Sequence, residues 1–62
     1  MLKHYSFRPV MLGDAEPVPL GDWTSNWKEA QMVLFQRGLA GYVHGIFVMM
    51  PLVTIEMESY YA

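Results

Sequence analysis

The feature that most constrains this chain is a long stretch without formal charge, GLAGYVHGIFVMMPLVTI at residues 38–55. In a helix these residues would cover about 27 Å, close to the roughly 30 Å hydrocarbon thickness of a bilayer. Counting back to Met32 adds apolar length but includes Arg37, whose long side chain can reach the headgroups. Pro51 is expected to bend such a helix. The stretch predicts a transmembrane helix. A buried helix of a soluble core is the competing interpretation, but too little chain remains to cover it.

Residues on both sides of the stretch fit a membrane boundary. Asn26 can cap the helix, and Glu29 can reach back to the Asn26 amide, as in a capping box. Aromatic residues that suit the two interfaces flank the stretch: Trp23, Trp27, Tyr60 and Tyr61. All four Lys and Arg residues precede it. The positive-inside rule therefore predicts a cytoplasmic or stromal N-terminus and a lumenal or periplasmic C-terminus.

The predicted fold is an all-α membrane protein with a single transmembrane helix over 26–57. A Pro- and Gly-rich extended segment, 1–25, precedes the helix, and a short tail, 58–62, follows it. The chain has 62 residues, 53% of them hydrophobic, and no cysteine for a disulfide or thiolate metal site. We therefore expect its stability to come from the lipid bilayer and from partner subunits. The few scattered basic residues predict no nucleic-acid partner.

His44 lies near the centre of the predicted helix, where a polar group usually marks a site. A neutral imidazole can serve as the axial ligand of a chlorophyll magnesium. Ala40, Gly41 and Gly45 leave room for a macrocycle or a neighbouring helix, and Phe47 can pack on the ring. Three other roles stay open for His44: a hydrogen bond to a neighbouring helix, proton transfer, or haem ligation with a second histidine from another chain.

Two short patterns resemble known families of photosynthetic proteins. Arg37-Gly38-Leu39 and the run His44-Gly45-Ile46-Phe47-Val48-Met49-Met50-Pro51 resemble the first membrane helix of photosystem I reaction-centre subunit XI (the L subunit). Here the spacing from Arg to His is one residue shorter, and that family's second and third helices are absent. Ala40-x-x-x-His44 is similar to single-helix bacterial light-harvesting polypeptides. Both resemblances imply chlorophyll or bacteriochlorophyll bound through magnesium to His44, with a carotenoid as a further candidate.

The sequence thus predicts a small accessory subunit of a photosynthetic reaction-centre or light-harvesting complex. It would lie in a thylakoid or bacterial photosynthetic membrane, and its partners would be pigments, the lipid bilayer and other membrane subunits. Catalysis is not expected, because no nucleophile–base pair, carboxylate dyad or phosphate loop is present. The alternatives are a pigment-free subunit that stabilises a membrane redox complex, and a small subunit that ligates a b-type haem.

Overall fold

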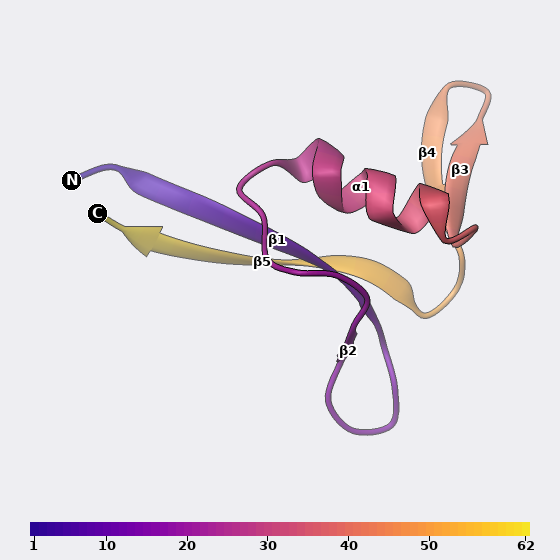
Figure 1. Cartoon of the computed structure of the whole chain (residues 1–62), viewed down its shortest axis with the longest axis horizontal. Helices are drawn as coiled ribbons and strands as arrows, with labels where there is room; N and C mark the ends of the chain where they lie inside the picture. Colours follow the sequence, from indigo (N-terminus) through magenta and orange to yellow (C-terminus); the bar gives the residue numbers. More distant parts are fainter.

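A computed structural model describes all 62 residues as a small β-rich fold with one helix (Figure 1). The elements in chain order are β1 (Lys3–Met11), β2 (Val18–Pro19), α1 (Trp27–Gln36), β3 (Ala40–Val43), β4 (Ile46–Met49) and β5 (Val53–Tyr61). One antiparallel sheet has the order β2-β1-β5, and β3 and β4 form a separate hairpin. The fold is thin, with extents of 38 × 31 × 15 Å.

The predicted all-α membrane fold is wrong. The one helix, α1, has ten residues, and no helix of the structure has the length and apolar character that a bilayer crossing requires. The predicted transmembrane helix over 26–57 is instead a short helix followed by three strands. The integral-membrane location and the description as a transmembrane photosystem subunit depended on that helix and are corrected with it.

Specific residues begin and end α1. Asn26 caps the first turn, and its side-chain oxygen accepts from the Lys28 amide at 3.0 Å, as predicted. Glu29 does not reach the Asn26 amide. It accepts from the Thr24 hydroxyl at 2.6 Å, and that same hydroxyl accepts from the Asn26 amide at 3.1 Å. The Thr24 hydroxyl thus connects the Asn26 amide to Glu29, in place of the direct hydrogen bond of a capping box.

The helix ends in a Schellman motif, where the predicted membrane span was expected to continue. The Gly38 amide donates to the Phe35 carbonyl at 3.0 Å, and the Leu39 amide donates to the Leu34 carbonyl at 2.9 Å. Gly38 has a φ of 73°, which a residue with a side chain adopts only at a cost. The charge-free stretch thus begins with a helix stop.

The centre of the same stretch is a hairpin turn. His44 and Gly45 have φ angles of 52° and 77°, the two consecutive positive values of a type I′ turn, which suits the twist of the strands it joins. A second turn follows at Pro51, where the Val53 amide donates to the Met50 carbonyl at 3.2 Å. Leu52 adopts a φ of 66° there. Pro51 therefore belongs to a turn between β4 and β5 and not to a helix kink.

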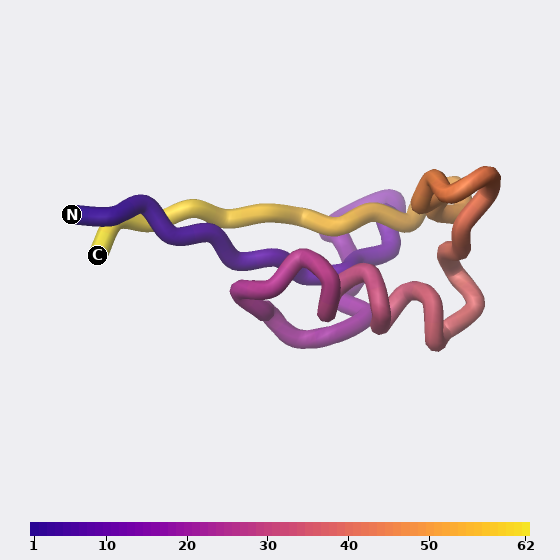
Figure 2. The backbone as a smooth tube through the Cα atoms, turned by 90° about the horizontal axis from the view of Figure 1, so that it is seen from above, coloured from indigo at the N-terminus to yellow at the C-terminus, as the bar shows by residue number.

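Strands β1 and β5 form a long ribbon with one continuous register. Lys3 pairs with Tyr61 at one end and Met11 with Val53 at the other. Leu2 and Ala62 extend the ladder by exchanging two hydrogen bonds of 3.0 Å. The expected C-terminal tail, 58–62, thus lies largely within β5. Figures 1 and 2 both show the two termini side by side at the far end of this ribbon.

The core lies where α1 covers the inner part of the ribbon. It contains Ala30 and Leu34 from the helix and Val53 and Ile55 from β5, all buried. Side chains that are only partly buried surround them: Phe7, Leu20, Leu39, Ala40 and Met49. Only six of the 62 residues are buried, so the fold covers a small share of its apolar side chains.

Candidate interaction surface

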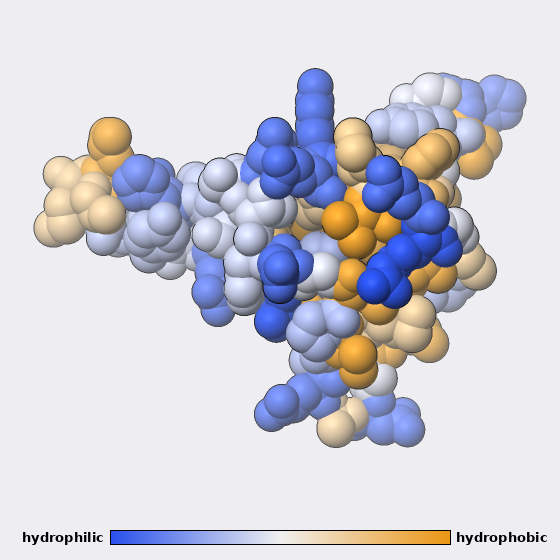
Figure 3. Space-filling model, in the orientation of Figure 1, coloured by the Kyte–Doolittle hydropathy of each residue, from blue (hydrophilic) through white to orange (hydrophobic).

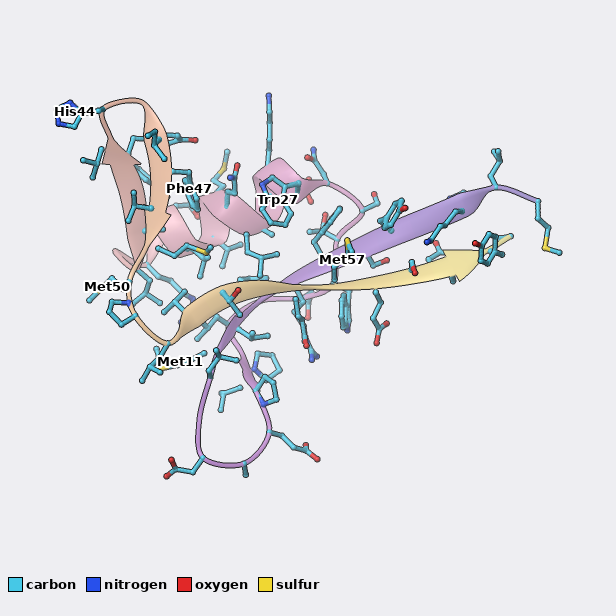
Figure 4. All side chains as sticks on the ribbon, turned by 180° about the vertical axis from the view of Figure 1, so that it is seen from behind. Met11, Trp27, His44, Phe47, Met50 and Met57 are labelled. Carbon is cyan, nitrogen blue, oxygen red and sulfur yellow. The ribbon has the colours of Figure 1, made fainter.

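The residues predicted to bind a pigment lie along the β3–β4 hairpin. His44 is exposed at the hairpin tip, and Figure 4 shows it pointing away from the rest of the molecule. Gly45 is its neighbour in the turn. Ala40 and Gly41 lie in β3, where they pair with Met49 and Val48.

The structure does not assemble these residues around one ligand position. In an extended strand Ala40 and His44 are separated by roughly 13 Å, whereas a helix would place them one turn apart. Phe47 lies near the helix, packed edge-on against Tyr42 with ring centroids 5.4 Å apart. Pigment ligation by His44 stays a prediction, but the small-residue face expected beside the imidazole is not formed.

No group of three or more His, Cys, Asp or Glu side chains is placed to hold a metal ion. Two of the six carboxylates engage other partners. Glu56 forms an ion pair with Arg8, whose Nε donates to it at 2.6 Å, and Glu29 accepts from Thr24. Arg8 also lies over the Trp23 ring, 4.6 Å from its centroid.

The main concave feature is a groove between α1 and the hairpin, with a volume of about 380 Å³. Lys28, Gln31, Met32 and Phe35 line the helix side. Their spacing of three and four residues places them along one face of α1. Tyr42 and Phe47, a directly paired couple across the hairpin, line the opposite side. We refer to these six residues as the groove.

Four of the six groove residues are apolar, and the other two are Lys28 and Gln31. Met32, Phe35 and Tyr42 keep 56%, 55% and 63% of their surface exposed, so nothing within the chain covers them. Lys28 has no salt-bridge partner, since the only ion pair in the structure joins Arg8 to Glu56. Figure 3 shows apolar surface on the side of the molecule that carries the helix and the hairpin, interrupted by polar side chains.

The groove was missed at the sequence level because its two sides were assigned to one helix. The helix side follows a helical period within 28–35, but the hairpin side comes from two short strands that pair across the turn at His44-Gly45. A two-residue loop ending in Gly, between short apolar runs, is the available signal for a hairpin. A hairpin with its turn at His44-Gly45 places Tyr42 opposite Phe47.

Comparisons with protein-family models, with curated proteins and with solved structures found no match to this chain.

Proposed function

We propose that this chain is a small non-catalytic interaction subunit that binds an apolar segment of a partner protein in the groove between α1 and the β3–β4 hairpin. The observation that carries the proposal is the open groove itself. Three of its large side chains, Met32, Phe35 and Tyr42, are exposed, and its volume lies at the small end of the roughly 300–1,000 Å³ typical of ligand sites. A groove of this size suits one or two large side chains.

The charge of the groove defines the partner more closely. Lys28 is the one charged residue of the lining and lacks an acidic partner within the chain. An incoming carboxylate next to an apolar side chain would pair with Lys28 while the ring or aliphatic group fills the space beside Met32. We therefore propose that the partner segment carries an aromatic or large aliphatic residue beside an aspartate or glutamate.

The surface chemistry supports an interaction role. Large apolar residues gathered around a concavity, with polar groups at the rim, are typical of protein-binding sites. Met and aromatic side chains are enriched at such interfaces, and Met32, Phe35, Tyr42 and Phe47 are all of these types. The assembly role of the pigment-free alternative is thus retained, without the membrane helix that was first predicted for it.

Two small ligands with the same ring and opposite charge test the groove. Indole-3-acetate and tryptamine both carry an indole, but only the first carries a carboxylate. In ¹⁵N-labelled protein we expect indole-3-acetate to shift amide signals within 28–35 and 42–47, with weak affinity, and tryptamine to bind several-fold more weakly. Lys28→Glu should reverse this preference.

Met32→Asp and Gln36→Asp form a matched pair for this experiment. Both add one negative charge at an exposed position of α1, but only Met32 lines the groove. We expect Met32→Asp to abolish the shifts and Gln36→Asp to keep them. Equal binding of the two ligands, or unchanged binding to Met32→Asp, would contradict the proposal.

A further inference from the structure

The outer edge of β5 is the second unpartnered feature of the molecule. In the sheet order β2-β1-β5, this strand has a neighbour on one side only. It is nine residues long, and its register with β1 continues without a bulge. It contains neither Pro nor Lys, which often protect an edge strand, and its two charged residues are Glu56, paired with Arg8, and Glu58. The edge is therefore competent to pair with another strand.

The hydrogen bonds identify which residues present their backbone to this edge. Phe7 exchanges hydrogen bonds with Thr24 on the outer side of β1, whereas Leu2 exchanges them with Ala62 of the ribbon. Along an antiparallel strand, the amide and carbonyl groups of successive residues point to opposite sides. The even-numbered residues of β1 and β5, like Leu2 and Ala62, therefore hydrogen-bond to each other within the ribbon. Met57, Ser59 and Tyr61 consequently direct their amide and carbonyl groups to the open edge.

The exposed part of the edge comprises Met57 and the arm, which we define as Lys3–Ser6 with Glu58–Tyr61. At the other end of β5, Val53 and Ile55 are buried in the core together with Ala30 and Leu34 of α1. The arm extends beyond α1, and no residue of it is buried (Figure 2). A two-stranded ribbon is marginally stable in water, and a third or fourth strand stabilises it.

We infer that two copies of this chain pair antiparallel through the outer edges of β5, about a two-fold axis at Ser59, to form a four-stranded sheet. An antiparallel pair of identical strands is self-complementary, because each amide that faces the axis meets a carbonyl of the other copy. The same three residues, Met57, Ser59 and Tyr61, then donate and accept in both copies. This inference does not rest on the groove.

Charge excludes the axes at Met57 and Glu58, and an axis at Tyr60 or Tyr61 would pair fewer residues than one at Ser59. An axis at Ser59 places Glu58 opposite Tyr60 of the second copy and Met57 opposite Tyr61. An axis at Glu58 would place the two Glu58 carboxylates opposite each other. An axis at Met57 would place Glu56 opposite Glu58 of the second copy. Like charges directly opposite each other destabilise a sheet. The axis at Ser59 places no two carboxylates directly opposite each other, and it joins Met57 to Tyr61 on the face that carries α1.

Disulfide trapping tests both the pairing and its register, because the chain has no native cysteine. Facing residues of a hydrogen-bonded antiparallel pair have Cα atoms about 5.5 Å apart, within reach of a disulfide. Under mild oxidation, Ser59→Cys should form a covalent dimer at least about tenfold faster than Ser25→Cys, because pairing raises the effective concentration of the two thiols. Ser25 is exposed in the loop before α1 and serves as the control.

A single backbone methyl group completes the test. A chain of this length is accessible to chemical synthesis, and N-methylation of Ser59 blocks its outward amide while leaving the ladder with β1 intact. Light scattering should give twice the chain mass for the unmodified protein and the chain mass for N-methyl-Ser59, with N-methyl-Asp14 still dimeric. The inference is overturned by an unmodified protein that stays monomeric at high concentration, by equal trapping at positions 59 and 25, or by faster trapping of Met57→Cys than of Ser59→Cys.

Discussion

The two halves of the β1–β5 ribbon share one register but differ in what covers them. The inner half, Phe7–Met11 with Val53–Met57, lies against α1 and contains Pro9, Val10, Val53 and Ile55, all buried. The arm has the same antiparallel pairing and no buried residue. Backbone pairing is therefore common to both halves, and the burial of apolar side chains is confined to one. Because net hydrogen bonding contributes little per pair, the inner half should carry most of the stability.

Contacts between side chains partly compensate the arm for its missing cover. His4 stacks on Tyr60 with ring centroids 5.2 Å apart, and the Lys3 ammonium lies 5.5 Å from the Tyr5 centroid and 5.9 Å from the Tyr61 centroid. At an exposed site each such contact contributes roughly 0.5–1 kcal/mol. These contacts favour the paired arm, but they do not replace a core.

The largest expected effect comes from truncating the side chain that covers the inner half. Leu34 is fully buried, so Leu34→Ala should lower the free energy of unfolding by about 3 kcal/mol, through lost burial and the cavity left behind. Leu2, which is 73% exposed at the arm, is the control, and Leu2→Ala should change the free energy by less than about 0.5 kcal/mol. Urea unfolding followed by tryptophan fluorescence measures both.

If Leu34→Ala proves too unstable to fold, Leu34→Met gives the same comparison at a smaller scale. Met nearly conserves the volume, and the expected loss is about 1 kcal/mol. Equal losses on truncating Leu34 and Leu2 would show that the arm contributes to the core as much as the inner half does.

Hydrogen exchange compares the two halves directly in the unmodified protein. The amides of Ser6 and Tyr60 in the arm, and those of Val10 and Thr54 in the inner half, occupy equivalent positions of the ladder. At low micromolar concentration we expect the arm amides to exchange about 100-fold faster, since local opening of the arm costs less than global unfolding. The measurement is two-dimensional NMR after transfer to D₂O. Equal rates would mean that the ribbon opens as one unit.

Protein concentration sharpens this comparison. If β5 pairs with a second copy, the amides of Ser59 and Tyr61 should gain protection as the concentration rises, while that of Val10 should not change. A gain at every amide would instead indicate global stabilisation.

A smaller effect is expected where the chain segment after β2 passes between the inner half and α1. A Cβ added to Gly21 would lie 3.2 Å from the Pro9 Cγ and 3.3 Å from the Val33 Cγ1. Gly21→Ala should therefore destabilise the fold by about 1–2 kcal/mol through overpacking. Gly13 has only the Glu16 carbonyl oxygen near it, at 4.0 Å, so Gly13→Ala is the control and should be close to neutral. Thermal unfolding by circular dichroism measures the pair, and equal melting temperatures would contradict the close packing.

Local signals in the sequence were sufficient for the start of the helix and insufficient for the rest. Asn26 was identified as the N-cap from its residue type and position, because capping depends on neighbours within one turn. The end of the helix was missed at Gly38. Apolar residues continue past Gly38 in the sequence and mask the stop, although glycine after the last helical turn is the usual stop signal.

The hairpin was missed because apolar content was weighed above periodicity. In the run from Ala40 to Met49, both faces of short strands carry apolar residues, so alternation is weak and the run has the hydropathy of a membrane helix. The turn at His44-Gly45 was the only strong local indication. A polar residue within an apolar run fits either a buried ligand site or an exposed turn, and His44 lies in a turn.

The pairing of β1 with β5 could not be predicted from the chain by itself. Lys3 and Tyr61 are neighbours in the sheet but nearly a whole chain length apart in sequence. Such a pairing carries no local signature, and its register follows from the fit of the core. The groove depends on the same long-range arrangement, since α1 and the hairpin meet only once the helix has stopped at Gly38.

The smallest expected effect isolates the stacking that helps to hold the arm. His4→Ala removes the contact with Tyr60, which at this exposed position contributes about 0.5–1 kcal/mol. Because the arm opens independently, exchange of the Ser6 amide should become about three- to fivefold faster, whereas the amides of Val10 and Thr54 keep their rates. Ser59→Ala, which alters the opposite face of the arm, is the control. Acceleration confined to the arm would show that its side chains stabilise it separately from the core. Faster exchange at Val10 as well would show that the two halves open as one cooperative unit. The difference in burial between the halves would then not correspond to a difference in local stability.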